Sequence, residues 1–297
     1  MKSRSGLFAV SFALLTISAT ASAQDPNFHI YLCFGQSNME GAGRIEEQDR
    51  TVDERFQVLQ AVDAPNLKRE KGKWYPAVPP LTRGRTGIGP ADYFGRTMVA
   101  ALPNEVRVGV VNVAVAGCKI ELFDKDAYQA YAATVQPWMT NIIKEYDGSP
   151  YQRLVEMGKL AKKDGVIKGI LLHQGESNTN DQQWPQKVKR VYDNLIKDLE
   201  LDPATVPLLA GELVNADQNG ACASMNKTIA ELPKTIPTAH VISSAGLACN
   251  PDRLHFTTAA FREFGKRYAE QMLSIIGKKA EAPKAPPQNE TAKEHVG

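Results

Sequence analysis

The stretch Phe28-His29-Ile30-Tyr31-Leu32-Cys33-Phe34-Gly35-Gln36-Ser37-Asn38-Met39 joins a nearly uninterrupted apolar run to a serine in a glycine-bounded turn. Continuous apolar runs are typical of strands that are buried on both faces of a parallel sheet. Ser37 is therefore expected on a sharp turn at the carboxyl end of a buried strand. A serine hydroxyl becomes a useful nucleophile where such a turn exposes its Oγ and a base lies nearby. An ordinary turn without chemistry is the alternative for this pentapeptide.

A second motif, Asp252-Arg253-Leu254-His255, lies near the C-terminal end of the chain. Pro251 disfavours a helical residue before it, so we expect the motif in a loop and a helix from about Thr257. Asp252 and His255 are three positions apart, so a turn can place the carboxylate beside the imidazole. The carboxylate can then hold the imidazole in one tautomer, and it can stabilise the imidazolium that forms when the imidazole takes the serine proton. The alternative is a helix-capping Asp252 beside a surface His255.

Two more apolar runs end in residues that suit a developing negative charge. Gln174, in His173-Gln174-Gly175-Glu176-Ser177-Asn178, can offer its amide N–H groups to an oxyanion. Gly117, in Ala114-Val115-Ala116-Gly117-Cys118, lets a backbone N–H approach a ligand closely. Each of these could also be a plain turn. All four motifs are expected at the carboxyl ends of strands, where open α/β sheets bind their ligands.

Five apolar runs indicate parallel strands, near residues 28–34, 106–115, 166–172, 207–212 and 239–244. Helical patterns lie between them, near residues 90–102, 150–163 and 183–200. Alternating strands and helices are typical of a doubly wound sheet with helices on both faces. The sequence therefore predicts an α/β fold, a single-domain three-layer α/β/α sandwich with about five parallel strands.

In order and content, the four motifs resemble the SGNH (GDSL-like) hydrolase superfamily, whose fold is flavodoxin-like. Gly35-Gln36-Ser37-Asn38-Met39 and His173-Gln174-Gly175-Glu176-Ser177-Asn178 are similar to the motifs of its acetylesterase branch. That branch includes the carbohydrate esterase family 6 acetyl xylan esterases and sialate O-acetylesterase-like proteins. The resemblance extends from about Phe28 to Met272. It implies a serine esterase that removes O-acetyl groups from a carbohydrate through an acyl-serine, with no cofactor and no metal.

By position, the resemblance implies Ser37 as the nucleophile and His255 as the general base and then the general acid. Asp252 would orient His255. The oxyanion hole would comprise the backbone N–H groups of Ser37 and Gly117 and the side chain of Gln174. The wider superfamily has Asn as the third donor, so Gln174 can fill this role only if its strand end is set back.

Three neighbouring residues, Gln36, Asn38 and Glu176, are expected to support this site through hydrogen bonds. For Glu176 there is an alternative, because its carboxylate could compete with Asp252 as the acidic partner of His255. The structural role for Glu176 is the preferred prediction.

The first 23 residues have the pattern of a secretory signal peptide. Lys2 and Arg4 precede a mostly apolar segment, and Ala21-Ser22-Ala23 fits cleavage before Gln24. The apolar segment is shorter than a membrane-spanning helix requires, and it contains more Ser and Thr than a membrane anchor usually does. The mature protein is therefore expected to be secreted or periplasmic in a bacterium. Residues 24–276 would form the hydrolase domain, and residues 277–297, rich in Pro, Lys and Glu, a disordered tail.

Charge excludes some classes of partner. The chain has 35 Lys and Arg residues and 33 Asp and Glu residues, and removal of the first 23 residues would balance these counts by taking away Lys2 and Arg4. A balanced chain lacks the basic surface with which proteins bind nucleic acid or anionic membranes. An acetylated carbohydrate is a compatible partner, and acetylated xylan is the first choice. The oligomeric state stays open.

The chain has four cysteines, which allow three full pairings in an oxidising compartment. Cys33 and Cys118 fall on or beside predicted strands and are expected as buried thiols. Cys222 and Cys249 lie in loop-like sequence, and a disulfide between them is a candidate that would brace the segment with the second motif. No Cys-x-x-Cys or paired His spacing supports a metal site.

Aromatic residues supply the candidates for sugar binding. Trp74 and Tyr75 lie in a proline-rich loop, where they form either a platform for sugar rings or a lid over the edge of the core. Trp138 and Trp184 each lie beside a proline near a predicted helix start, and a structural role is expected for both.

Three other functions remain as alternatives. The first is an esterase for another glycan, such as an acetylated sialic acid. The second is a non-catalytic carbohydrate-binding protein on the same fold, which a serine-directed phosphonate would distinguish from an esterase. The third is a thiol or metal enzyme that uses Cys118.

Overall fold

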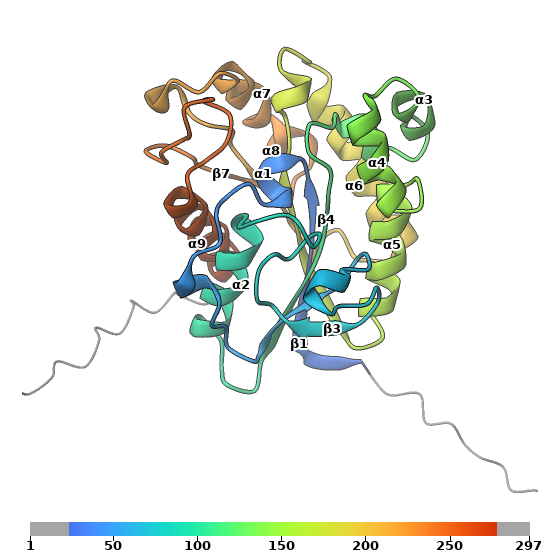
Figure 1. Cartoon of the computed structure of the whole chain (residues 1–297), viewed down its shortest axis with the longest axis vertical. Helices are drawn as coiled ribbons and strands as arrows, with labels where there is room; N and C mark the ends of the chain where they lie inside the picture. The colour runs from blue at the N-terminus through green and yellow to red at the C-terminus, as the bar shows by residue number, and fades with distance from the viewer. Residues whose placement is uncertain (1–23, 278–297) are drawn as a thin grey trace, which may run out of the picture.

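The apolar run before Ser37 forms the central strand, β1 (Asp25–Gly35), in the computed structural model of the chain, which describes residues 24–277 (Figure 1). In this part of the chain seven strands form one sheet in the order β3-β2-β4-β1-β5-β6-β7. All neighbouring strands are parallel except β2 and β3, which are antiparallel. The other strands are β2 (Phe56–Leu59), β3 (Trp74–Pro76), β4 (Arg107–Ala114), β5 (Gly165–His173), β6 (Leu208–Gly211) and β7 (Ala239–Ile242).

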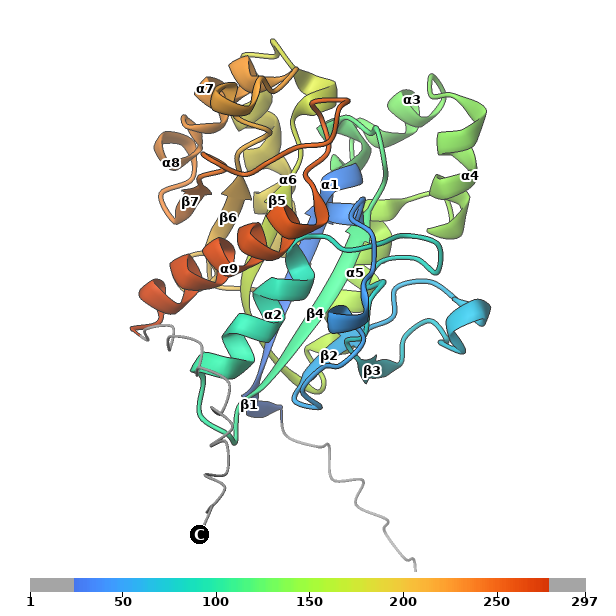
Figure 2. The same cartoon turned by 60° about the vertical axis from the view of Figure 1, so that its left-hand side comes forward.

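Helices cover both faces of this sheet (Figure 2). Helices α2 and α9 pack together on one face, and α5 and α6 lie on the other. The α-helices are α1 (Ser37–Glu40), α2 (Pro90–Ala101), α3 (Tyr128–Ala132), α4 (Pro137–Glu145), α5 (Pro150–Ala161), α6 (Trp184–Asp198), α7 (Asn226–Ile229), α8 (Leu232–Thr235) and α9 (Thr258–Ile275). Short 3-10 helices are η1 (Glu47–Asp49), η2 (Pro65–Leu67), η3 (Ile120–Phe123), η4 (Glu176–Asn178), η5 (Ala216–Gln218) and η6 (Ala223–Met225).

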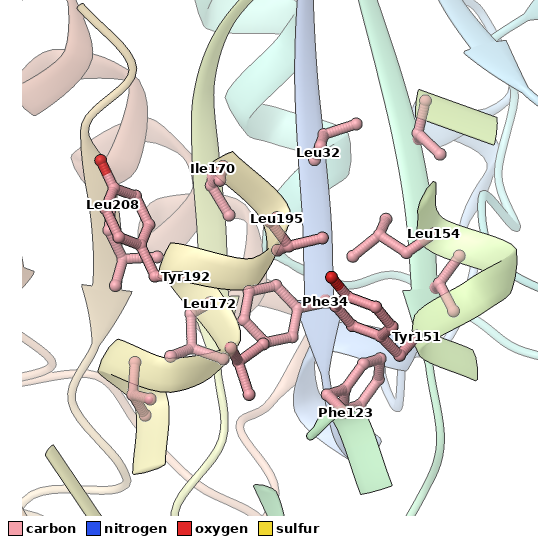
Figure 3. Packing of buried hydrophobic residues seen from close by; sticks show 14 of the residues in the cluster. Leu32, Phe34, Phe123, Tyr151, Leu154, Ile170, Leu172, Tyr192, Leu195 and Leu208 are labelled. Atoms are coloured by element: carbon pink, nitrogen blue, oxygen red, sulfur yellow. The ribbon is translucent and has the colours of Figure 1, made fainter. Parts of the chain in front are cut away.

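Strand β1 contributes side chains to both hydrophobic cores because successive side chains of a strand point to opposite faces of the sheet. One core lies under α5 and α6 (Figure 3) and contains Ile30, Leu32, Phe34, Leu154 and Leu195. The other lies under α2 and α9 and contains Tyr31, Cys33, Phe94, Phe261 and Phe264. Apolar packing on both faces fixes the position of β1 within the sheet, and this also fixes the position of the turn that follows it.

The predicted α/β sandwich is confirmed, with a correction to the number of strands. The five apolar runs correspond to β1, β4, β5, β6 and β7, and the helical patterns correspond to α2, α5 and α6. Strands β2 and β3 were not predicted, because Gln57 interrupts the apolar residues of β2 and β3 lies in the proline-rich loop that contains Trp74. The helix expected from about Thr257 is α9, with Thr257 as its N-cap.

The predicted signal peptide (residues 1–23) and the predicted tail beyond Gly277 lie outside the described residues. Within residues 24–277, no helix combines the length and the apolar composition that crossing a membrane requires.

Gly35, the last residue of β1, pairs with His173, the last residue of β5. Its φ is +152°, and a Cβ at this position would lie 2.1 Å from the carbonyl oxygen of His173. We expect Gly35→Ala to lower the free energy of unfolding by about 3 kcal/mol or more, because a backbone contact cannot relax as a side chain can.

The matched control for this substitution is Gly148→Ala. Gly148 also has a positive φ, +86°, but an added Cβ would meet nothing within 4 Å. Only the cost of the left-handed backbone, about 1–2 kcal/mol, is then expected. Urea unfolding of the two variants measures the difference, and equal losses would contradict the role of the close approach at Gly35.

Candidate active site

Ser37 is the first residue of α1, directly beyond the carboxyl end of β1. The turn is closed by two backbone hydrogen bonds, from Glu40 N–H to Gln36 O at 2.8 Å and from Gly41 N–H to Ser37 O at 3.0 Å. Both neighbours of Ser37 in the chain, Gln36 and Asn38, are buried, whereas Ser37 itself is partly exposed. The local structure therefore anchors the turn and leaves the serine accessible.

His255 lies in a loop that its neighbours hold rigidly. The Asp252 carboxylate accepts hydrogen bonds from the backbone N–H groups of Leu254, at 2.9 Å, and His255, at 3.0 Å, which fixes the turn between the two residues of the motif. The next residue, Phe256, is fully buried against Phe264, with ring centroids 5.1 Å apart. The loop thus ends in a hydrophobic anchor directly before α9.

The structure brings Ser37, His255 and Asp252 together. His255 Nε2 lies 2.9 Å from Ser37 Oγ, and His255 Nδ1 lies 2.7 Å from Asp252 Oδ2. Burial tends to raise the pKa of Asp252, but hydrogen bonds from the His255 backbone, the His255 ring and the Leu254 backbone outweigh it and leave that pKa below its ordinary value. The carboxylate is therefore an ionised acceptor, which places the ring proton on Nδ1 and the free lone pair of Nε2 toward the Ser37 hydroxyl.

Asn38 connects the serine turn to the histidine loop. Its Nδ2 donates to Glu176 Oε1 at 2.7 Å and to the carbonyl oxygen of Leu254 at 3.0 Å, and its Oδ1 accepts from Phe256 N–H at 3.4 Å. The carboxylate of Glu176 is thus bound to Asn38, and the carboxylate beside His255 is that of Asp252. This arrangement agrees with the supporting role expected for Asn38 and Glu176.

The loop after β4 brings Gly117 beside the serine turn. Val115 N–H donates to the carbonyl oxygen of Gly35 at 3.1 Å, and Gly117 O accepts from Ser177 Oγ at 2.8 Å. Gly117 has a φ of +69°, which a residue with a side chain adopts only at a cost. Within residues 24–277, the N–H groups of Ser37 and Gly117 have no hydrogen-bond acceptor, so both are free to bind an oxyanion.

Gln174 is not an oxyanion donor in this structure, and that prediction is wrong. The residue is buried, and its Nε2 donates to Asn178 Oδ1 at 2.8 Å and to the carbonyl oxygen of Cys118 at 3.1 Å. Its Oε1 accepts from the indole of Trp184 at 2.5 Å. Both amide protons are therefore committed to structure, and Gln174 ties the end of β5 to the Gly117 loop. Gln36 shares this network, since its Oε1 lies 3.2 Å from Gln174 Nε2.

An ion pair that the sequence did not reveal supports the same loop. The carboxylate of Glu40 accepts from Arg83 at 2.7 Å and from the backbone N–H of Ala116 at 3.3 Å. Burial raises the pKa of Glu40 even though the Arg83 guanidinium opposes that shift. The only sequence signal was the position of Glu40 on the serine turn, and nothing indicated Arg83, which comes from a distant loop.

Trp74 and Tyr75 do not contribute to the site, and this prediction is also wrong. Trp74 packs on Phe28, with ring centroids 4.8 Å apart, and its indole N–H donates to Asp164 Oδ2 at 2.9 Å. Phe28 lies near the amino end of β1, whereas Ser37 follows its carboxyl end. Figure 1 accordingly shows β3 and α1 well apart along the sheet. Trp74 covers the edge of the core, which was the alternative to a sugar platform.

The cysteines are free thiols in the structure. Cys33 and Cys118 are fully buried, and burial raises the pKa of both thiols, so neither forms a nucleophilic thiolate near neutral pH. The candidate disulfide between Cys222 and Cys249 is not formed. Their sulfur atoms lie instead near backbone carbonyl oxygens, those of Glu176, at 3.8 Å, and Gln218, at 3.6 Å.

The sequence of the chain is similar to those of known carbohydrate esterases. A family model described as "Carbohydrate esterase, sialic acid-specific acetylesterase" matches residues 27–274. A probable carbohydrate esterase of Arabidopsis thaliana is 24% identical over 263 residues, which cover 84% of this chain and 92% of the plant protein.

Solved structures share the fold. The X-ray structure of an Arabidopsis thaliana protein has a TM-score of 0.62 at 22% identity, covering 84% of this chain and 99% of that one. NanS has a TM-score of 0.60 at 16% identity, covering 85% and 98%. A carbohydrate acetylesterase from Xanthomonas citri has a TM-score of 0.58 at 18% identity, covering 83% of this chain and 56% of that one.

Proposed function

Because the chain belongs to the sialic acid-specific acetylesterase family of carbohydrate esterases, we propose that it removes O-acetyl groups from a carbohydrate through an acyl-serine, with Ser37 as the nucleophile. Membership makes the chain a carboxylic ester hydrolase that acts on carbohydrate, which sets aside the binding-only alternative. The residues and the intermediate are the proposal. The contact of His255 Nε2 with Ser37 Oγ, at 2.9 Å, is the observation that carries it.

The first half of the reaction forms the acyl-serine. Ser37 Oγ attacks the acetyl carbonyl carbon while its proton moves to His255 Nε2, and the carbonyl oxygen becomes an oxyanion. The N–H groups of Ser37 and Gly117 donate to that oxyanion, and Asp252 stabilises the imidazolium. When the bond between the acetyl carbon and the sugar oxygen breaks, His255 returns the proton to the sugar oxygen.

The second half releases acetate. A water molecule gives a proton to His255 Nε2 and attacks the acyl carbon, and the same two N–H groups stabilise the second oxyanion. The bond to Ser37 Oγ then breaks, and Ser37 recovers its proton from His255. Every proton taken by the imidazole is returned within the cycle, and the hydrolysis of the ester changes no oxidation state.

The substrate that we propose first is acetylated xylan, because the motifs are similar to those of the acetyl xylan esterases. A second candidate is an acidic sugar such as an O-acetylated sialic acid. A hollow of about 360 Å³ beyond α1 is lined by Gly41–Ile45 and Arg85–Gly87, and its charged residues are Arg44 and Arg85. The backbone N–H of Arg44 donates to Thr258 Oγ1 at 2.8 Å, so this hollow lies beside the start of α9, which follows the histidine loop.

Acetate release from acetylated xylan, an O-acetylated sialic acid and a chromogenic acetate tests this proposal. We expect release from at least one of the two sugars at a higher kcat/KM than from the chromogenic acetate. With an acidic substrate, kcat/KM should fall as ionic strength rises, because salt screens the attraction to Arg44 and Arg85. With neutral xylan it should not. Activity on the chromogenic ester alone would contradict a carbohydrate substrate.

We also propose, from sequence alone, that residues 1–23 are a signal peptide that is removed on export. Residues 24–276 would then act as the catalytic domain outside the bacterial cytoplasm, in the periplasm or beyond it. In the part of the chain that the structure describes, no group of three or more His, Cys, Asp and Glu side chains is arranged to hold a metal ion.

A further inference from the structure

Trp138, the second residue of α4, is the most exposed large apolar side chain within residues 24–277. It is 51% exposed, and the other large apolar side chain that is exposed, Ile275, is 38% exposed at the far end of α9. A single exposed apolar residue needs no explanation by itself. The position of Trp138 is the informative feature, since its indole borders the proposed oxyanion hole.

The contact between Trp138 and Gly117 is direct. A Cβ on Gly117 would lie 2.9 Å from Cη2 of the indole and 3.5 Å from its Cζ2. Gly117 O accepts from Ser177 Oγ at 2.8 Å, and Ser177 N–H lies 3.5 Å from Oε1 of Gln36, the residue before the serine. The six-membered ring of the indole therefore lies against the backbone that we assign to the oxyanion hole.

The helix that carries Trp138 is firmly anchored. Pro137 is its first residue, and the side chains of Met139 and Ile143 are buried in the core under α5 and α6. The hydroxyl of Tyr131, in α3, lies 3.8 Å from Met139 Sδ and accepts from the backbone N–H of Lys119 at 3.0 Å. Figure 2 shows α3 and α4 beside each other on the same side of the sheet's carboxyl edge. The indole is thus an exposed surface on a rigid support.

We propose that Trp138 is a platform for a pyranose ring of the acetylated substrate, and so a residue that sets specificity for a carbohydrate over a small ester. This inference rests on the proposed function. An indole face suits the C–H surface of a pyranose, and a rigid aromatic anchor loses little conformational entropy on binding. An acetyl carbonyl bound between Ser37 and Gly117 would leave the attached sugar next to this side chain.

The test compares two substrates in Trp138→Ala and Trp138→Phe. For Trp138→Ala we expect the loss of kcat/KM on the acetylated sugar that the wild-type chain prefers to exceed the loss on a chromogenic acetate about tenfold or more, from the apolar contact removed. Trp138→Phe, which retains an aromatic face, should recover part of the difference. Ile275→Ala, which removes the other exposed apolar side chain, should leave the ratio of the two values unchanged.

Equal losses on both substrates would overturn the platform, since they would show only a disturbed Gly117 loop. A wild-type chain that releases acetate from no sugar would instead contradict the proposed function. Intrinsic fluorescence gives an independent measurement. Of the three tryptophans, Trp184 is fully buried and Trp74 packs on Phe28, near the amino end of β1 and away from Ser37. The deacetylated form of the preferred sugar should therefore shift the emission of the wild-type chain and not that of Trp138→Phe. An equal shift in both proteins would also overturn the inference.

Discussion

A Ser37→Ala variant is expected to hydrolyse a chromogenic acetate about 10⁴-fold more slowly than the wild-type chain, or slower still. The substitution removes the only atom that can carry the acyl group in the proposed cycle. Its partner, His255, would remain in place through the hydrogen bonds of its own loop. The rate of nitrophenol release at matched protein concentration measures the effect, and thermal melting checks that the fold is retained.

Ser177→Ala is the matched control for this prediction. Ser177 is a second serine at the Gly117 loop, where its hydroxyl donates to Gly117 O at 2.8 Å. Loss of that bond should slow turnover about tenfold at most, because a neutral hydrogen bond contributes about 1 kcal/mol. A loss in Ser177→Ala as large as that in Ser37→Ala would remove the distinction on which the assignment of the nucleophile rests.

Asp252→Asn is expected to lower kcat about 10³–10⁴-fold with little effect on KM. An amide N–H at this position would donate to His255 Nδ1, which would move the ring proton to Nε2, facing Ser37. The serine would then have no base. In the wild-type chain the lowered pKa of Asp252 keeps the carboxylate ionised at every pH above its ordinary range, so its protonation should limit activity only in strong acid.

Glu176→Gln separates the two candidate acids. Glu176 Oε1 accepts from Asn38 Nδ2 at 2.7 Å, and within residues 24–277 its Oε2 is buried without a hydrogen-bond partner, so a Gln side chain keeps the oxygen that Asn38 needs. We therefore expect a loss in kcat of about tenfold or less. Steady-state kinetics of both variants decide between the acids. A larger loss in Glu176→Gln than in Asp252→Asn would show that Glu176 serves His255.

The architecture could be predicted because its signals are local. Five long apolar runs identify the buried strands, and each motif follows such a run, so the carboxyl edge of the sheet could be located from the sequence. Strands β2 and β3 were missed because Gln57 interrupts the apolar residues of Phe56–Leu59 and because Trp74–Pro76 lies in a proline-rich loop. Helices α7 and α8, of four residues each, are too short to show a helical period.

The direction of a side chain at the site could not be predicted in the same way. The sequence places Gln174 at the end of a strand beside the serine turn, which is correct. Whether its amide faces the substrate or the interior depends on Trp184, Cys118 and Asn178, which compete for it from other elements. The resulting hydrogen bonds exist only in the folded chain.

The aromatic residues show the same limit. The composition of the loop with Trp74 predicted a sugar platform. In the structure, β3 pairs with β2 at the edge of the sheet and places Trp74 near the amino end of β1. Trp138 was expected to be structural because a proline precedes it at a helix start. That proline does begin α4, but the buried positions of the helix fall on Met139 and Ile143 and leave the indole outside.

Labelling of the intact protein with a serine-directed phosphonate, followed by peptide mapping, tests the central claim most directly. We expect one adduct per chain on the peptide that contains Ser37, and none after Ser37→Ala. The label should appear much more slowly in His255→Ala, since Nε2 would no longer accept the serine proton. An adduct on another residue, or none on a chain that still releases acetate, would contradict an acyl-serine at Ser37.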